Sequence, residues 1–94
     1  MSNKHYIDTA SSDSQFCMPN IGVPYDVWLL KKYKTASTVI DGRPSFHGIA
    51  QKINSLIFEA REHKCSLVAF GQHAKEAAKV IRALAHDSID VEVA

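Results

Sequence analysis

A cluster of basic residues is the part of the sequence best suited to binding chemistry. Its cations are Lys31, Lys32, Lys34, Arg43 and Lys52, and Tyr33 interrupts the run of lysines. Cations that neutralise phosphates release counterions and supply most of the non-specific affinity for nucleic acids, and a tyrosine ring can stack on a base. The cluster therefore predicts a local nucleic-acid-binding patch. Its alternative is a solvated basic edge that discourages strand pairing.

A second candidate site is the segment Gly71-Gln72-His73, where a predicted strand passes into a predicted helix. Backbone N–H groups at this point meet the positive end of the helix dipole, so an anion could bind there. His73 could bind phosphate, accept a phosphoryl group or act as a general acid and base. The alternative is that Gly71 ends the strand and His73 is a partly exposed residue of the first helical turn.

Aromatic side chains suggest a third kind of site. Tyr25, Trp28, Leu29 and Tyr33 could anchor a protein–protein interface, because aromatic residues dominate the binding energy of such interfaces. Packing of Trp28 in the core is the alternative. This third reading describes a small interaction module, inhibitor or regulator.

Motifs for metal binding and covalent catalysis are missing from the sequence. The histidines and Cys65 are possible ligands, but no pair at helical spacing with a third ligand is evident. Ser45, Ser55 and Ser66 lack the Gly-x-Ser-x-Gly frame of a nucleophilic serine. We therefore expect no metal, no cofactor and no enzymatic activity.

The composition limits any site to a local patch. The chain has 94 residues, of which 46% are hydrophobic and 22% charged, which suits one small domain and excludes a large multidomain enzyme. Its formal net charge is only +1, unlike that of a general polycation. The two cysteines lack CxxC spacing and predict reduced thiols. No apolar run has the length of a signal peptide or a membrane span, so we expect a cytoplasmic protein with no membrane partner.

The elements that would position these residues begin after a polar segment. Residues 1–22 are rich in turn formers and predict a mobile tail, which leaves residues 23–94 as a single α/β domain. The segment 24–34 is ambiguous, because Pro24 and Asp26 suit a first helical turn while its aromatic and branched residues suit a strand. We favour the strand.

Residue patterns in the next stretch predict a strand, a turn and a helix. The β-branched residues of 35–40 indicate the strand, and the Asp, Gly and Pro of 41–44 indicate the turn. Ser45 can cap the helix, whose apolar residues recur at spacings of three and four as far as Ala60.

The C-terminal third predicts two more strands and one more helix. Leu67–Phe70 is apolar without alternation, as in a central strand covered on both faces, and a helix is expected over Gln72–His86. Ile89–Val93 alternates apolar and acidic residues, as in a strand with one wet face. The expected architecture is a two-layer α/β sandwich with a strand-helix-strand-helix-strand order, a mixed sheet and two helices packed on it.

Two stretches of this order resemble the Alba-like superfamily. Val39-Ile40-Asp41-Gly42-Arg43-Pro44 resembles the first strand and basic loop of Alba proteins, and the stretch 69–78 is similar to their second strand-to-helix turn. Stage V sporulation protein S, similar to Alba in fold, shares the pattern of a short helix after a Ser/Pro loop. The resemblance spans about residues 35–93. The chain departs from the family in its single basic residue in the first loop and in the lack of a final hairpin.

The resemblance implies binding of DNA or RNA by a homodimer of Alba-like fold. It places Arg43 in the basic-loop position, and it places Gln72, His73 and Lys75 around the second turn. Together with the basic cluster, it predicts a small nucleic-acid-binding regulatory protein. The interaction module around Trp28 and the anion-binding domain at Gly71–His73 stay open as alternatives.

Overall fold

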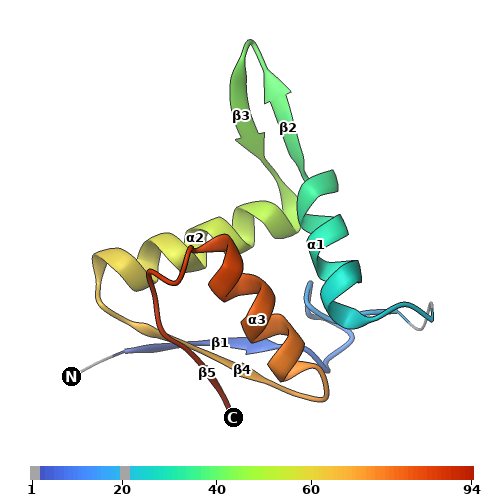
Figure 1. Ribbon diagram of the computed structural model, residues 1–94, viewed down its shortest axis with the longest axis vertical. Helices are drawn as coiled ribbons and strands as arrows, with labels where there is room; N and C mark the ends of the chain where they lie inside the picture. The colour runs from blue at the N-terminus through green and yellow to red at the C-terminus, as the bar shows by residue number, and fades with distance from the viewer. Residues whose placement is uncertain (1–2, 20–21) are drawn as a thin grey trace.

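Three short parallel strands form the sheet of the computed structural model, which describes residues 3–19 and 22–94. The strands are β1 (Lys4–Asp8), β4 (Ser66–Phe70) and β5 (Val91–Val93), in the order β1-β4-β5. Ile7, Leu67 and Ala69 are fully buried and point into the core. Every connection between these parallel strands crosses over through helices, and Figure 1 shows those helices on one side of the sheet.

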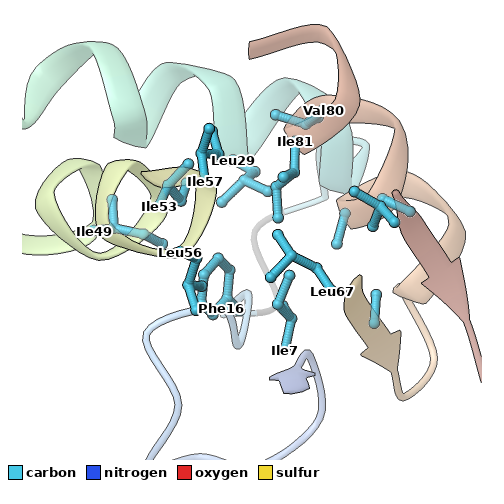
Figure 2. Packing of buried hydrophobic residues seen from close by; sticks show 14 of the residues in the cluster. Ile7, Phe16, Leu29, Ile49, Ile53, Leu56, Ile57, Leu67, Val80 and Ile81 are labelled. Carbon is cyan, nitrogen blue, oxygen red and sulfur yellow. The ribbon is translucent and has the colours of Figure 1, made fainter. Parts of the chain in front are cut away.

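The helical layer consists of α1 (Tyr25–Thr35), α2 (Gly48–Glu62) and α3 (Ala74–Leu84). Each helix buries one stripe of apolar side chains, and α1 packs against both α2 and α3. Figure 2 shows Leu29, Ile53 and Ile81 of the three helices meeting above Leu67 of the sheet. These four residues are fully buried, so one continuous core joins the helices to β4.

Within the described residues, no helix covers the outer face of the sheet (Figure 1). Val68 points to this face and is nevertheless only 6% exposed, and it lies between Tyr6 of β1 and Glu92 of β5 in the strand register. Tyr6 and Phe70 pack edge to face with ring centroids 6.3 Å apart. Lys4 and Glu92, on the two edge strands, form an ion pair of 3.2 Å that spans β4.

A β-hairpin projects from the helical layer, between the end of α1 and the start of α2 (Figure 1). It consists of β2 (Ser37–Ile40) and β3 (Arg43–Phe46), which pair in antiparallel fashion. Asp41 and Gly42 join them with φ values of +53° and +75°. Two consecutive positive φ angles are what a tight hairpin turn requires, and Asp-Gly is a preferred pair for it.

The α/β class and the two-layer arrangement predicted from the sequence are confirmed. The expected helices after residues 45 and 72 exist as α2 and α3, and Leu67–Phe70 lies in the central strand β4. The sheet differs from the expected mixed sheet, because all three strands are parallel and the antiparallel pair stands apart from it as the hairpin. The helical layer also holds a third helix, α1.

The strand favoured for residues 24–34 is wrong, since this segment forms α1. Pro24 precedes the first turn and Asp26 lies within it, where a carboxylate stabilises the helix dipole. Tyr25, Trp28 and Leu29 are buried at a spacing of three and four residues, which is the helical period. The aromatic content therefore serves a helix face and not a pleated strand.

The mobile tail expected for residues 1–22 is replaced by ordered structure over most of its length. β1 pairs with β4, Ile7 is fully buried and Phe16 is 3% exposed in the core. The polar loop after β1 satisfies its own backbone, because Asp8 Oδ1 accepts bonds from the N–H groups of Ala10 and Ser11. Residues 1–2 and 20–21 of the expected tail lie outside the described residues.

The predicted turn and helix cap after residue 40 are also corrected. The strand predicted over 35–40 exists as β2, but it belongs to the hairpin and not to the sheet. The turn is confined to Asp41-Gly42, so the chain continues as β3 through Ser45. The N-cap of α2 is therefore His47, with no side-chain capping bond.

Candidate nucleic-acid interface

The hairpin presents two faces of different chemistry. In its register Thr38 is opposite Ser45 and Ile40 is opposite Arg43, and directly opposed residues point to the same side of a ribbon. One face, called here the polar face, thus carries Thr38, Ile40, Arg43 and Ser45. All but the half-buried Ser45 are exposed. The polar face offers two hydroxyls, one guanidinium and one aliphatic side chain.

Four lysines lie on the two helices that flank the hairpin. Lys31, Lys32 and Lys34 lie on the second half of α1, which leads directly into β2, and Lys52 lies near the start of α2, which follows β3. All four are exposed. Lys32 Nζ lies 4.9 Å from the centroid of the Trp28 ring, so its ammonium group is directed one helical turn back toward the N-terminus of α1. The helix segments that carry these lysines therefore adjoin the base of one projecting element, the hairpin (Figure 1).

Charge is strongly segregated along the chain. Residues 27–58 hold five cations, the four lysines above and Arg43, and one acid, Asp41, for a net charge of +4. The remaining residues carry six cations and nine acids, for a net charge of −3. The two ion pairs found among the described residues, Lys4–Glu92 and His63–Glu59, involve none of these five cations. The hairpin end is therefore positive within a chain that is almost neutral overall.

The residues predicted around the second turn lie apart from this basic end. His73 stacks on Tyr25, the first residue of α1, with ring centroids 4.7 Å apart and an interplanar angle of 12°. Lys34 lies nine residues further along the same helix, a rise of about 14 Å. Gln72, His73 and Lys75 therefore sit at the far end of α1 from the hairpin, and the structure does not join them to the lysine cluster.

The start of α3 is held by contacts within the protein. The His73 N–H donates to Thr9 Oγ1 at 3.3 Å, and the Thr9 hydroxyl donates to the Phe70 carbonyl at 2.7 Å. Thr9 is 1% exposed. One of the backbone donors that the anion-site hypothesis needs is thus already used, and the His73 ring is occupied by its stack on Tyr25.

The aromatic anchors proposed for a protein interface are core residues. Tyr25 is 3% exposed, Trp28 is 9% exposed and Leu29 is fully buried. The Tyr25 hydroxyl donates to the Phe16 carbonyl at 2.5 Å, and burial raises the pKa of this hydroxyl, with smaller contributions from Cys17 and Glu76. Tyr33 is half-buried and donates to Asn54 Oδ1 at 2.9 Å. Tyr25, Trp28 and Leu29 are therefore not available at the surface, and Trp28 packs in the core as the alternative interpretation held.

Sequence reasoning missed the polar face of the hairpin. Thr38, Ile40 and Ser45 were assigned to a strand of the sheet and to a helix cap, and their common side follows only from the antiparallel register. The available signal was the Asp41-Gly42 pair between two short strand-forming runs, which is typical of a hairpin.

The described residues show no metal site and no membrane-spanning helix beside the hairpin. Within residues 3–19 and 22–94, no group of three or more His, Cys, Asp or Glu side chains is placed to hold a metal ion. In the same ranges no helix combines the length and apolar character needed to span a membrane. Comparison of the chain with protein-family models, curated proteins and solved structures finds no match.

Proposed function

We propose that the hairpin end of this protein binds nucleic acid, with double-stranded DNA as the preferred form. The observation that carries the proposal is the net charge of +4 gathered around an exposed two-stranded ribbon. The lysines at the base of the hairpin would contact phosphates, and the polar face of the ribbon would contact base edges. Such a division of labour between phosphate and base contacts is common in DNA-binding proteins.

The width of the ribbon supports DNA over duplex RNA. The major groove of B-form DNA is about 12 Å wide and admits a two-stranded β-ribbon, whereas the major groove of A-form RNA is too narrow for protein elements to read. On the polar face, Arg43 can donate two hydrogen bonds to a guanine, and the hydroxyls of Thr38 and Ser45 can contact other base edges. Ile40 can contact a thymine methyl group.

The number of cations sets the expected salt dependence. Five basic side chains that each neutralise one phosphate give a log–log slope of affinity against salt of about −4.5. Raising the salt fourfold, from about 50 to about 200 mM, should then weaken binding by about 500-fold. Phosphate contacts, and not base contacts, cause the salt dependence of the affinity. Most of the salt dependence should therefore also be seen with DNA duplexes of unrelated sequence.

Fluorescence anisotropy with a labelled DNA duplex tests the proposal. The test variant is Lys31→Gln/Lys32→Gln/Lys34→Gln/Arg43→Gln, and the matched control is Lys4→Gln/Lys64→Gln/Lys75→Gln/Lys79→Gln, which removes the same charge outside the hairpin end. Both variants have a formal net charge of −3, because each loses four cations from +1.

We expect the test variant to lose nearly all affinity and most of the salt dependence, and the control to stay close to the wild type. Equal weakening by the two variants would mean that only overall charge matters. Absence of binding by the wild type at about 50 mM salt, where electrostatic binding is strong, would overturn the proposal.

A further inference from the structure

The helix α1 carries apolar side chains on two of its sides. Tyr25, Trp28 and Leu29 face the core, whereas Val27 is 54% exposed and Leu30 is 36% exposed. A surface helix of a globular protein ordinarily has one apolar stripe, and a helix that is apolar all round is ordinarily a buried one. The side of α1 that carries Val27 and Leu30 is therefore suited to a partner that covers it.

Two hollows that share Val27 and Leu30 form a groove along this side of α1. The first lies between α1 and α3, which pack against each other (Figure 1). It is lined by Asp26, Val27, Leu30, Lys79, Val80 and Ala83. The second is lined by Val27, Leu30, Lys31, Lys34 and Thr35. The name helix groove is used below for these two hollows together.

The size of the helix groove matches a short helix. The first hollow has a volume of about 210 Å³. Because an apolar cavity of about 150 Å³ holds a benzene molecule, this hollow has room for one leucine or phenylalanine side chain. From Val27 to Thr35, α1 rises about 12 Å, which equals about two turns of a second helix laid beside it. A helix that binds in a groove presents apolar anchors at spacings of three, four and seven residues, so its anchors can enter both hollows.

The charges at the helix groove are mostly positive. Lys31 and Lys34 lie on the α1 side and Lys79 lies on the α3 side, and all three are exposed. None of them takes part in the two ion pairs found among the described residues. The single acid, Asp26, lies in the first turn of α1, where its Oδ1 accepts a hydrogen bond from the Val27 N–H at 2.9 Å. A partner with acids on both sides of its apolar stripe would meet a cation on each wall.

We propose that the helix groove binds an acidic amphipathic helix of another protein. The apolar stripe of that helix would cover Val27 and Leu30, and its carboxylates would lie near Lys31 and Lys34 on one side and Lys79 on the other. A fatty acid fits less well, because it has one charged end whereas the groove has cations on two walls. The same three lysines disfavour a basic helix, since like charges brought together oppose binding.

Fluorescence anisotropy with three labelled synthetic peptides tests the proposal. The first peptide is a helix of about 18 residues, with leucines at spacings of three and four and glutamates on both sides of the leucine stripe. The second has lysines in place of the glutamates, and the third has the composition of the first in an order that forms no stripe. The test variants are Leu30→Gln in α1 and Ala83→Gln in α3. The matched control is Phe58→Gln, which removes an apolar side chain that is 60% exposed on α2.

The wild type should bind the glutamate peptide at least about tenfold more tightly than the other two peptides. Leu30→Gln should weaken this binding by at least about tenfold, because an amide replaces an aliphatic contact, and Phe58→Gln should leave it unchanged. Ala83→Gln should also weaken it, because its longer side chain fills the first hollow from α3 and leaves α1 unaltered. No saturable binding of the glutamate peptide up to about 1 mM, equal binding of the glutamate and lysine peptides, or equal effects of Leu30→Gln and Phe58→Gln would overturn the proposal.

DNA binding by the hairpin end is tested separately from the helix groove. Leu30→Gln and Ala83→Gln keep every cation of the chain. DNA binding should therefore be unchanged in both variants, and the failure of either proposal can be distinguished from the failure of the other.

Discussion

Replacement of Gly71 by alanine should be among the most damaging small changes in this protein. Gly71 has φ +100°, and a Cβ atom built on it would lie 2.4 Å from Thr9 Oγ1 and 3.1 Å from the Ala10 backbone nitrogen. The positive φ costs an alanine about 1 to 3 kcal/mol. Displacing the Thr9 hydroxyl adds about 1 kcal/mol, because it breaks the partly buried bond to the Phe70 carbonyl.

Gly71→Ala should therefore lower the free energy of unfolding by about 3 kcal/mol, which corresponds to a fall in Tm of about 12 to 24 °C for a domain of this size. Urea and thermal unfolding followed by circular dichroism measure both quantities. The control is Gly42→Ala in the hairpin turn, where φ is +75° but no atom lies within 4 Å of the added Cβ. Equal effects at the two positions, or no partial rescue of Gly71→Ala by Thr9→Ala, would refute the close packing of β1 against the start of α3.

Three further predictions follow from the same structure. Trp28→Ala should lower the free energy of unfolding by about 3 to 5 kcal/mol in urea unfolding, because Trp28 is a core residue, and a change of less than 1 kcal/mol would contradict its burial. Because the pKa of the Tyr25 hydroxyl is raised above its ordinary value of about 10, the folded state holds this proton more tightly than the unfolded state, so stability should fall as the pH rises above about 10. Tyr25→Phe should remove that alkaline loss in urea titrations at several pH values, and an unchanged pH profile would argue against it. Phosphate should leave the Tm of the wild type unchanged, because the His73 N–H is already bonded to Thr9, whereas a rise that His73→Ala abolishes would revive the anion site.

The sequence predicted the elements whose patterns are long and periodic. The stripe from Ile49 to Ala60 is found on the buried side of α2, and the apolar run Leu67–Phe70 is found in the central strand β4. The expected cover on both faces of that strand is wrong, because the helices cover one face only and Phe70 is 36% exposed. The segment 24–34 was misassigned because its buried residues are aromatic and its lysines follow closely, which weakens the helical pattern. The spacing of three and four residues between Tyr25, Trp28 and Leu29, which is typical of a helix, is nevertheless visible in the sequence.

Long-range pairing is the part that local patterns do not contain. β1 has one fully buried residue, Ile7, and becomes a strand of the sheet only because the distant β4 offers a free edge. In the same way, the lysines of α1 and Arg43 were visible as a cluster, but the two faces of the hairpin depend on the register between β2 and β3. The separation of His73 from the lysines depends on how α1 spans the helical layer.

The most direct test of the DNA-binding account is a titration of ¹⁵N-labelled protein with a short DNA duplex, followed by amide chemical shifts. If the hairpin end binds DNA, the largest shifts fall on residues 31–34 and on the hairpin, with Thr38, Arg43 and Ser45 among them. Small shifts are expected for β5 and for the loop that contains His73. Shifts centred on Thr9 and His73, or an unchanged spectrum at low salt, would contradict the assignment of the hairpin end as the nucleic-acid interface.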